Sequence, residues 1–323
     1  MKSGSTLEKV IASGKPAVTA ELGPPMSADP HEVIKKAQML KGFCDAANIT
    51  DCQTAVVRIS SIAAAAIALQ QGLEPVMQMT CRDRNRIAMQ ADLLGGAALG
   101  LKNCLCIAGD HQSFSSAGRL KGHPGAKNVY DVDTCQLVGI LKKMRDESKQ
   151  EGGDPLEVAP KFFIGASWTP MADPIDFRPI NLMKKVNAGA DFIQTQGIYD
   201  MSLFREQMAK IRNMGLHEKT AILAGIIVPK SAMMLKYMDS SVAGVSVPKE
   251  LIDRMNKAKA AAGDDKKKMK ELQEQEGIKI TIELIHQALE TPGVRGVHIQ
   301  AIEWESAIEG IVKAAGLYPR PAV

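Results

Sequence analysis

Several polar side chains follow short apolar runs, at the points where the chain leaves each run. They are Glu21, Thr50 with Asp51, Gln78 with Thr80, Asp110, and Gln196. Carboxyl groups can transfer protons, while amides and hydroxyls can orient a ligand by hydrogen bonds. If the apolar runs are parallel strands of one barrel, their carboxyl ends meet at one mouth. These residues therefore form a candidate site for acid–base chemistry.

Glu21 ends the run AVTAEL (17–22) and is followed by Gly23-Pro24-Pro25. An acid in such a place commonly caps a helix or forms a salt bridge in a loop. The two prolines favour an extended, fixed loop and disfavour a helix that starts one residue later. A rigid loop that holds a partly desolvated carboxyl group suits a general acid, because desolvation raises the pKa toward neutrality. We therefore expect Glu21 to be a proton donor.

The stretch AGDH (108–111) follows another apolar run. Gly109 would let the backbone approach a ligand closely, and an ionised Asp110 could accept hydrogen bonds from the N–H groups of a heterocycle. An ordinary Gly-Asp turn accounts for the same residues equally well. The basic, glycine-rich segment 118–127 could surround a phosphate group, or it could be a mobile loop.

Common site motifs are absent from the sequence. No G-x-G-x-x-G follows a strand, and there is no P-loop, no H-E-x-x-H and no G-x-S-x-G. His111, His123 and His298 are isolated, which is more typical of loop or core residues than of ligands. The six cysteines have no C-x-x-C or zinc spacing, and most lie in apolar runs. We therefore expect no metal site, and free thiols in a reducing cytoplasm.

The apolar runs alternate with helical patterns along the chain. Eight runs have the composition of buried strands: 17–22, 46–50, 75–80, 104–109, 162–167, 191–196, 221–227 and 296–302. Stretches of helical periodicity separate them, and several end on glycine just before the next run. Eight such units predict an α/β fold, a (β/α)8 TIM barrel, as a single domain over residues 1–323.

A ninth apolar run, SVAGVSV (241–247), competes for the place of the eighth strand. Gly244 interrupts it, and the other eight runs already close the barrel. Residues 248–290 are then a helical insertion before the last strand. The polar stretch 263–277 within it is typical of a solvated helix and turn, with a docking surface as the alternative.

Composition excludes several classes of protein. The net charge is +4, with Lys and Arg spread along the chain, which is weak support for nucleic-acid binding. The first 15 residues lack the apolar run of a signal peptide, and no window approaches the ~20 apolar residues of a membrane span. We expect a cytoplasmic protein without a membrane span or a nucleic-acid partner, and a homo-oligomer is possible.

Taken together, the motifs resemble the methylenetetrahydrofolate reductase family. The matching features are E-x-x-P-P from Glu21, Thr80-Cys81, Gly109-Asp110 and NAGADFIQTQ (187–196). The resemblance extends from about residue 15 to about residue 317. The shorter segments 122–133, 247–251 and 297–305 look like the branch of anaerobes that form acetate or fix carbon by the Wood–Ljungdahl pathway.

The resemblance implies a flavoprotein barrel that binds FAD, with FMN as the alternative. Such an enzyme passes a hydride from reduced flavin to 5,10-methylenetetrahydrofolate and gives 5-methyltetrahydrofolate. Glu21 would be the acid that opens the methylene bridge, Asp110 would act near flavin and pterin, and Gln196 and Thr50 would contact the substrate. The positions implied to bind flavin are Thr50, Gln78, Ala108, Gly109, Asp110, Asp131, Thr169, Asn181, Lys184 and Lys185.

The chain departs from the family pattern at four positions. Ala108 stands where an Arg is frequent, and Gln78 where a His is common. Gln300 and Trp304 replace a Tyr and an Arg of members that use pyridine nucleotides. These departures argue against NADH as the direct electron donor. The resemblance to the anaerobe branch implies a second redox subunit, or one that carries zinc or iron–sulfur clusters.

Two other functions compete with the reductase. One is a flavin-free barrel methyltransferase that moves a methyl group between a pterin and a corrinoid protein. The other is an assembly subunit that keeps the fold without turnover. The joint presence of Glu21, Asp110 and Gln196 argues against the second alternative.

Overall fold

The computed structural model describes every residue except 114, 117, 118 and 121. Eight parallel strands close into a barrel in the order β1-β10-β9-β8-β7-β4-β3-β2. The strands are β1 (Ala17–Leu22), β2 (Ala46–Ile49), β3 (Pro75–Thr80), β4 (Asn103–Ile107), β7 (Phe163–Trp168), β8 (Phe192–Gly197), β9 (Ala221–Ile227) and β10 (Val294–Gln300). The predicted barrel is confirmed, and every predicted strand lies within two residues of an observed one.

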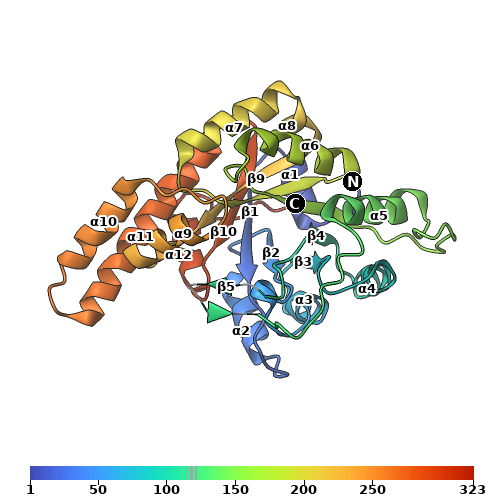
Figure 1. Ribbon diagram of the computed structural model, residues 1–323, viewed down its shortest axis with the longest axis horizontal. Helices are drawn as coiled ribbons and strands as arrows, with labels where there is room; N and C mark the ends of the chain where they lie inside the picture. Colours follow the sequence, from blue (N-terminus) through green and yellow to red (C-terminus); the bar gives the residue numbers. More distant parts are fainter. Residues whose placement is uncertain (114, 117–118, 121) are drawn as a thin grey trace.

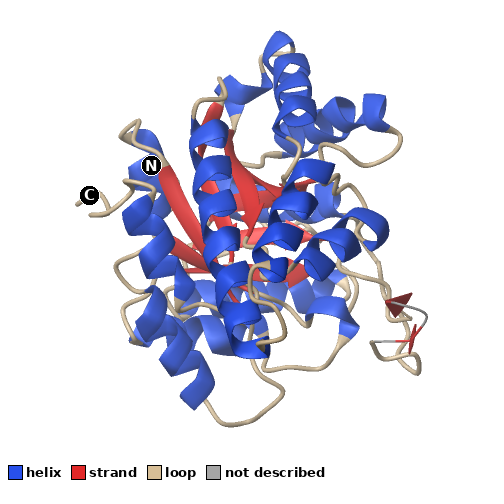
Figure 2. Ribbon diagram, turned by 90° about the vertical axis from the view of Figure 1, so that its left-hand side faces the viewer, coloured by secondary structure: helices blue, strands red, loops and turns tan. Residues whose placement is uncertain are grey.

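Helices surround the barrel (Figures 1 and 2). Those that connect successive strands include α2 (His31–Leu40), α3 (Ser61–Gln70), α4 (Arg86–Ala98), α5 (Thr134–Glu147), α6 (Arg178–Ala188), α7 (Met201–Asn213) and α9 (Ala232–Ser241), and α12 (Ala307–Ala314) follows the last strand. Shorter elements are α1 (Thr6–Ala12), α8 (Leu216–Lys219), the 3-10 turns η1 (Gln53–Ala55) and η2 (Ile175–Phe177), and the hairpin β5 (Ser115–Ser116) and β6 (Arg119–Leu120). Among the described residues, no helix is both long and apolar enough to cross a bilayer.

The segment 118–127, predicted to be either a phosphate-binding or a mobile loop, lies partly beyond what the structure describes. Positions 118 and 121 are outside the described residues. The remainder includes Gly122, whose φ is +92° and where a Cβ atom would lie 2.6 Å from the carbonyl oxygen of Gln112. His123 N–H donates to that same oxygen at 2.9 Å, so this part of the loop is tied to the segment that follows β4.

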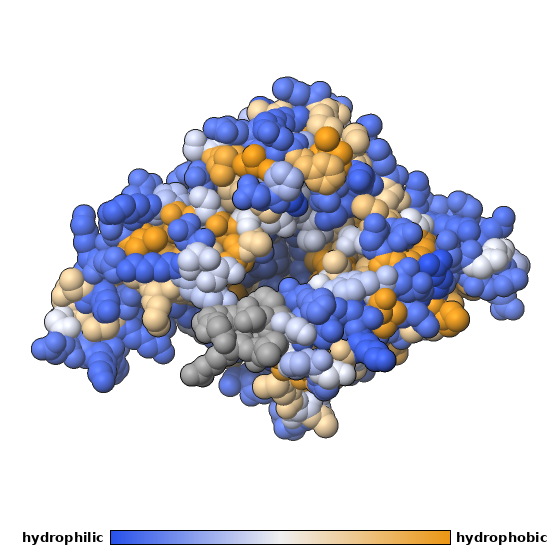
Figure 3. Space-filling model, in the orientation of Figure 1, coloured by the Kyte–Doolittle hydropathy of each residue, from blue (hydrophilic) through white to orange (hydrophobic). Residues whose placement is uncertain are grey.

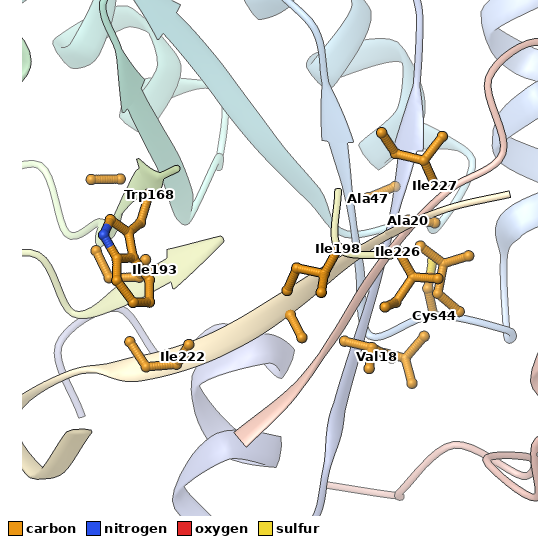
Figure 4. Close-up of a cluster of buried hydrophobic side chains, with 14 of the residues drawn as sticks. Val18, Ala20, Cys44, Ala47, Trp168, Ile193, Ile198, Ile222, Ile226 and Ile227 are labelled. Atoms are coloured by element: carbon orange, nitrogen blue, oxygen red, sulfur yellow. The ribbon is translucent and has the colours of Figure 1, made fainter. Parts of the chain in front are cut away.

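The strands bury two separate apolar layers, because successive side chains of a strand point to opposite faces. Outward-facing residues such as Val18, Ala20 and Ile226 pack under the helices (Figure 4). Inward-facing residues at the amino ends of the strands form a second cluster, to which α1 contributes Leu7 and Val10. This second cluster fills the bottom of the barrel with apolar side chains.

Between β9 and β10 the chain forms α9, α10 (Lys249–Ala260) and α11 (Lys266–Leu289). The helices α10 and α11 lie side by side and extend away from the strands (Figure 1). Arg254 on α10 joins them through ion pairs with Glu276 at 2.8 Å and Glu283 at 2.6 Å. The run 241–247 contains no strand, and its Gly244 has a φ of +75°, in agreement with the prediction that it does not belong to the barrel.

At Gly277, α11 passes close to the segment that follows β9. A Cβ atom there would lie 1.8 Å from the carbonyl oxygen of Pro229, which follows β9. We expect Gly277→Ala to lower the free energy of unfolding by about 1–3 kcal/mol, as overpacking does. The measurement is urea unfolding of the full chain.

Gly310 on α12 provides the matched control. It is exposed, and a Cβ atom there would meet nothing within 4 Å. Because alanine favours a helix over glycine by about 1 kcal/mol, Gly310→Ala should raise the free energy of unfolding. Equal effects of the two substitutions would show that the contact with Pro229 does not constrain α11.

Candidate active site

A cavity of about 340 Å³ opens at the carboxyl ends of the strands. Such a volume is within the range of small-molecule sites. Figure 3 shows one face of the molecule hollowed near its centre, where hydrophilic residues gather. Residues predicted from the sequence that line the cavity are Asp51, Gln78, Thr80, Ala108, Gly109, Asp110, Thr169 and Gln196. The structure thus brings together eight positions that come from five different strands and their loops.

The floor of the cavity is a layer of buried polar side chains. Asn48 Nδ2 donates to Gln194 Oε1 at 2.6 Å, and Gln194 Nε2 donates to Asn48 Oδ1 at 3.0 Å and to Thr19 Oγ1 at 3.1 Å. Thr19 Oγ1 also lies 3.0 Å from His298 Nδ1. Burial lowers the pKa of His298 to about 3, so this ring is neutral. The floor is therefore polar, hydrogen-bonded and uncharged.

Three of these four floor residues were not predicted to belong to the site, and His298 was expected in a loop or the core. The sequence did contain a signal for this layer. Thr19 lies two positions before Glu21, Asn48 two before Thr50, and Gln194 two before Gln196. Residues two apart on a strand point to the same face. Counting back by two from each candidate residue would have found the layer beneath the site.

Glu21 stands at the rim of this interior, at the end of β1. Its neighbour across the ladder on β2 is Asn48, and Gln300 Nε2 on β10 approaches its Oε2 at 3.4 Å. Burial raises the pKa of Glu21 to about 7; the contact with Gln300 opposes this rise, the negative charge of Glu305 adds to it, and the positive charge of Lys36 opposes it. Glu21 is not itself a lining residue, but it contacts Gln300, which lines the cavity. The half-buried carboxyl group can therefore hold or release a proton near neutral pH.

Gln300 offers an unused acceptor at the same place. Its Oε1 atom is buried and has no hydrogen-bond partner among the described residues. A buried carbonyl oxygen without a donor costs about 1–3 kcal/mol. A ligand N–H or O–H group placed in the cavity would remove that cost.

Asp110 is exposed at the mouth and binds the segment after β2. Its Oδ2 accepts a hydrogen bond from the backbone N–H of Thr54 at 2.9 Å. Thr50 lies behind this segment, because its Oγ1 donates at 2.8 Å to Gln53 Oε1, and Gln53 lines the cavity. Thr50 itself is buried and not in the cavity wall.

The segment after β2 has an unusual backbone. Cys52, Thr54 and Ala55 have φ angles of +46°, +57° and +56°, in the left-handed region that residues other than glycine rarely adopt. Each such residue costs of order 1–3 kcal/mol and persists only where its surroundings hold it. The hydrogen bond from Thr54 to Asp110 is one of the contacts that hold this segment.

Arg82 makes further contacts that hold the segment after β2. Its side chain is almost fully buried, at 2% exposure. Nη2 donates to the carbonyl oxygen of Cys52 at 3.1 Å, Nη1 to that of Asp110 at 3.1 Å, and Asp83 accepts from Nε at 2.7 Å. Arg82 therefore joins the loops after β2, β3 and β4, and it places a positive charge in the wall that also contains Ala108. Arg82 was not predicted from the sequence, although a charge directly after an apolar strand was the available signal.

Gly109 lies where a side chain would not fit. Its φ is +87°, and a Cβ atom would lie 3.0 Å from the Cβ atom of Thr80 and 3.1 Å from that of Arg82. Tyr130 donates its hydroxyl hydrogen to the carbonyl oxygen of Gly109 at 3.1 Å. The loop after β4 is thus packed closely against the loop after β3.

Besides Glu21 and Thr50, four further predicted positions lie outside the cavity wall. Asp131 is exposed and accepts from Arg86 Nε at 2.9 Å, and its hydrogen bonds from Arg86 lower its pKa. On α6, Lys184 Nζ lies 5.3 Å from the ring centroid of Phe177. Lys185 Nζ donates to the carbonyl oxygen of Ser167 at the end of β7. Burial lowers the pKa of Lys185.

Asn181, the fourth such position, lies on α6 as well and is half-buried. Only a ligand that extends beyond the cavity could contact these four residues. Among the described residues, no group of three or more His, Cys, Asp or Glu side chains is placed to hold a metal ion.

The family model described as methylenetetrahydrofolate reductase matches residues 6–316. The chain belongs to this family. Methylenetetrahydrofolate reductase 1 of Schizosaccharomyces pombe is 24% identical over 249 residues, which are 76% of this chain and 36% of that protein. The probable methylenetetrahydrofolate reductase (NADPH) of Caenorhabditis elegans is 21% identical over 266 residues, 81% of this chain and 35% of the other. The chain thus spans about a third of the length of these curated relatives.

A solved structure agrees with the fold. It is that of an uncharacterized protein from Clostridium thermocellum that binds two copies of 5-methyl-5,6,7,8-tetrahydrofolic acid. The TM-score is 0.61 at 14% sequence identity, and the match covers 96% of this chain and 99% of the other. At this identity the similarity establishes a shared fold.

The contacts of Arg82 predict a local effect of its removal. Arg82→Met would take away the donors to Cys52 and Asp110 and release the strained segment after β2. We expect amide hydrogen exchange in residues 50–56 to become at least about tenfold faster, the equivalent of one lost hydrogen bond of about 1.4 kcal/mol. Hydrogen-exchange mass spectrometry of the full chain measures this rate.

Arg86→Met is the matched control, because it removes an exposed arginine whose partner is Asp131. Exchange in residues 50–56 should be unchanged in this variant. An unchanged rate in Arg82→Met as well would show that Arg82 does not hold the segment.

Proposed function

We propose that this chain catalyses the reduction of 5,10-methylenetetrahydrofolate to 5-methyltetrahydrofolate, with Glu21 as the general acid. The observation that carries this proposal is the carboxyl group of Glu21 at the end of β1, which contacts the cavity residue Gln300 and whose pKa burial raises to about 7. Membership of the methylenetetrahydrofolate reductase family supports the choice of substrate. The match to a protein that binds 5-methyl-5,6,7,8-tetrahydrofolic acid supports it further.

The polar side chains of the cavity wall are chemically suited to bind a flavin ring. A flavin ring presents both donors and acceptors along its edge, and Gln78 and Gln196 offer amide groups of both kinds. The buried Oε1 atom of Gln300 offers a further acceptor. When bound, FAD or FMN would supply the hydride.

Within this proposal, the cavity residues Gln78, Ala108, Gly109, Asp110 and Thr169 would hold the ring system. The residues outside the cavity would hold the remainder of the cofactor; they are Thr50, Asp131, Asn181, Lys184 and Lys185. A cofactor as long as FAD would account for positions outside the wall. The shorter FMN would leave some of them without a ligand, so the identity of the bound flavin tests these assignments.

Glu21 moves the proton in this scheme. At neutral pH about half of the Glu21 carboxyl groups carry a proton, because the pKa lies near 7. Transfer of that proton to a nitrogen of the methylene bridge breaks the carbon–nitrogen bond and leaves an electrophilic iminium carbon on the substrate. That carbon then accepts the hydride. Gln300, which contacts Glu21, would keep the carboxyl group oriented toward the cavity.

Asp110 and Gln196 would orient the folate. Asp110 already accepts a hydrogen bond from Thr54 through Oδ2, and a carboxylate has capacity for further donors such as the N–H groups of a pterin. Gln196 at the end of β8 faces the cavity and accepts from the backbone N–H of Gly197 at 3.0 Å. Its amide NH₂ group can donate to a ligand.

We expect Glu21→Gln to leave flavin binding intact and to slow folate reduction by about 10²- to 10⁴-fold, the usual contribution of a positioned general acid. The wild-type rate should fall as the pH rises through about 7, because the ionised carboxylate has no proton to give. The measurement is the rate at which reduced flavin is reoxidised by methylenetetrahydrofolate.

Glu309→Gln, at an exposed carboxylate on α12 paired with Lys313, is the control and should not change that rate. A loss of less than about threefold in Glu21→Gln would remove Glu21 from the role of acid. A purified protein without flavin absorbance that transfers methyl groups would support the methyltransferase alternative.

The electron donor is a separate proposal. Ala108 supplies no positive charge in the cavity wall, and Gln300 and Trp304 stand where pyridine-nucleotide-using members have a Tyr and an Arg. We propose that a second subunit, one with a redox centre or with bound zinc or iron–sulfur clusters, takes part, and that its redox-active centre delivers the electrons.

Stopped-flow mixing of the isolated, oxidised chain with NADH tests this. We expect slow or no bleaching of the flavin, and acceleration by a subunit that co-purifies. Bleaching at about 10 s⁻¹ or faster, an ordinary rate of enzyme turnover, would contradict the need for a partner.

A further inference from the structure

An ion pair lies close enough to Glu21 for both of its charges to act on the carboxyl group. Lys36 on α2 places its Nζ 2.7 Å from Oε1 of Glu305, which follows β10. The side chains of Lys36 and Glu305 are only 19% and 8% exposed. A buried ion pair is seldom a net gain in stability, because both charges lose water. Its position suggests another role.

The pair is fixed to the loop that follows Glu21. Lys36 Nζ also donates to the carbonyl oxygen of Gly23 at 3.2 Å. Gly23 is two residues after Glu21, a separation that spans at most about 7 Å of extended chain. The two prolines that follow Gly23 limit the motion of this loop. The two charges of the pair are thereby held close to the end of β1.

The other groups around Glu21 are neutral. Gln300 on β10 and Asn48 on β2 are amides, and the His298 ring on β10 is uncharged because burial lowers its pKa to about 3. Among the described residues, the charged groups that act on Glu21 are Glu305, which raises its pKa, and Lys36, which lowers it. Opposite charges joined at 2.7 Å largely cancel at a third site.

We propose that Lys36 and Glu305 are positioning residues that set the proton affinity of Glu21 by balancing each other. As a pair they leave burial and the contact with Gln300 to determine that affinity. Either charge without the other would change the proton affinity of Glu21. This inference deepens the proposed function, because it explains how an acid at the barrel mouth is kept ready both to hold and to release its proton.

Removing one charge at a time tests the balance. In Glu305→Gln the ammonium group of Lys36 is left unpaired and should favour the ionised form of Glu21, lowering its titration midpoint by about one pH unit. In Lys36→Met the carboxylate of Glu305 is left unpaired and should raise the midpoint by a similar amount. The double variant Lys36→Met/Glu305→Gln removes both charges, and its midpoint should return to within about 0.3 pH unit of the wild type.

The experiment is carbon-13 NMR of the full chain labelled at the glutamate carboxyl carbon, titrated between about pH 4 and pH 9. Glu21 is identified as the resonance that disappears in Glu21→Gln. The exposed pair on α12, changed as Lys313→Met/Glu309→Gln, is the control and should leave the midpoint unchanged. Lys36→Arg conserves the charge and should keep the wild-type midpoint, so it serves if Lys36→Met does not fold.

Opposite shifts in the two single variants, with restoration in the double variant, support the proposal. Unchanged midpoints, or shifts in the same direction, would overturn it and leave the pair a structural contact between α2 and the loop after β10. The titration needs no substrate and no turnover. If Glu21→Gln reduces folate normally while the midpoints shift as expected, the proposed acid role fails and the balance of charges stands.

Discussion

Every feature of the site depends on the alternation of side chains along parallel strands that close on themselves. Closure gives all eight strands one common interior, and alternation sends every second residue into it. The interior therefore fills in layers. Apolar residues close the bottom with α1, neutral hydrogen-bonded residues form the middle, and titratable and amide groups stand at the open end.

The middle layer obeys the requirement that buried polar groups be paired. Asn48 and Gln194 satisfy each other, and Thr19 links Gln194 to the ring of His298. A charge in this layer would be costly unless it were paired and hydrogen-bonded, because it would lose its contact with water. The charged groups are accordingly at the rim, where Lys36 pairs with Glu305 and Arg82 with Asp83.

The strands could be predicted from the sequence because apolar composition and spacing are local properties. Glu21 could be singled out because its prolines are its immediate neighbours. Arg82 could not, since its partners Cys52 and Asp110 lie 30 and 28 positions away and are brought together only by closure of the barrel. The contact of Gln300 with Glu21 spans 279 positions and is equally invisible to local patterns.

The reciprocal amide pair has a consequence for how far a ligand can enter. Asn48 and Gln194 line the cavity, yet their facing oxygens and nitrogens are already engaged with each other. A ligand atom that took one of these groups would leave its partner unpaired, at a cost of about 1–3 kcal/mol. The pair therefore limits how deeply a ligand can enter the pocket. A ligand is thereby kept at the carboxyl ends of the strands, where the cavity residue Gln300 contacts Glu21.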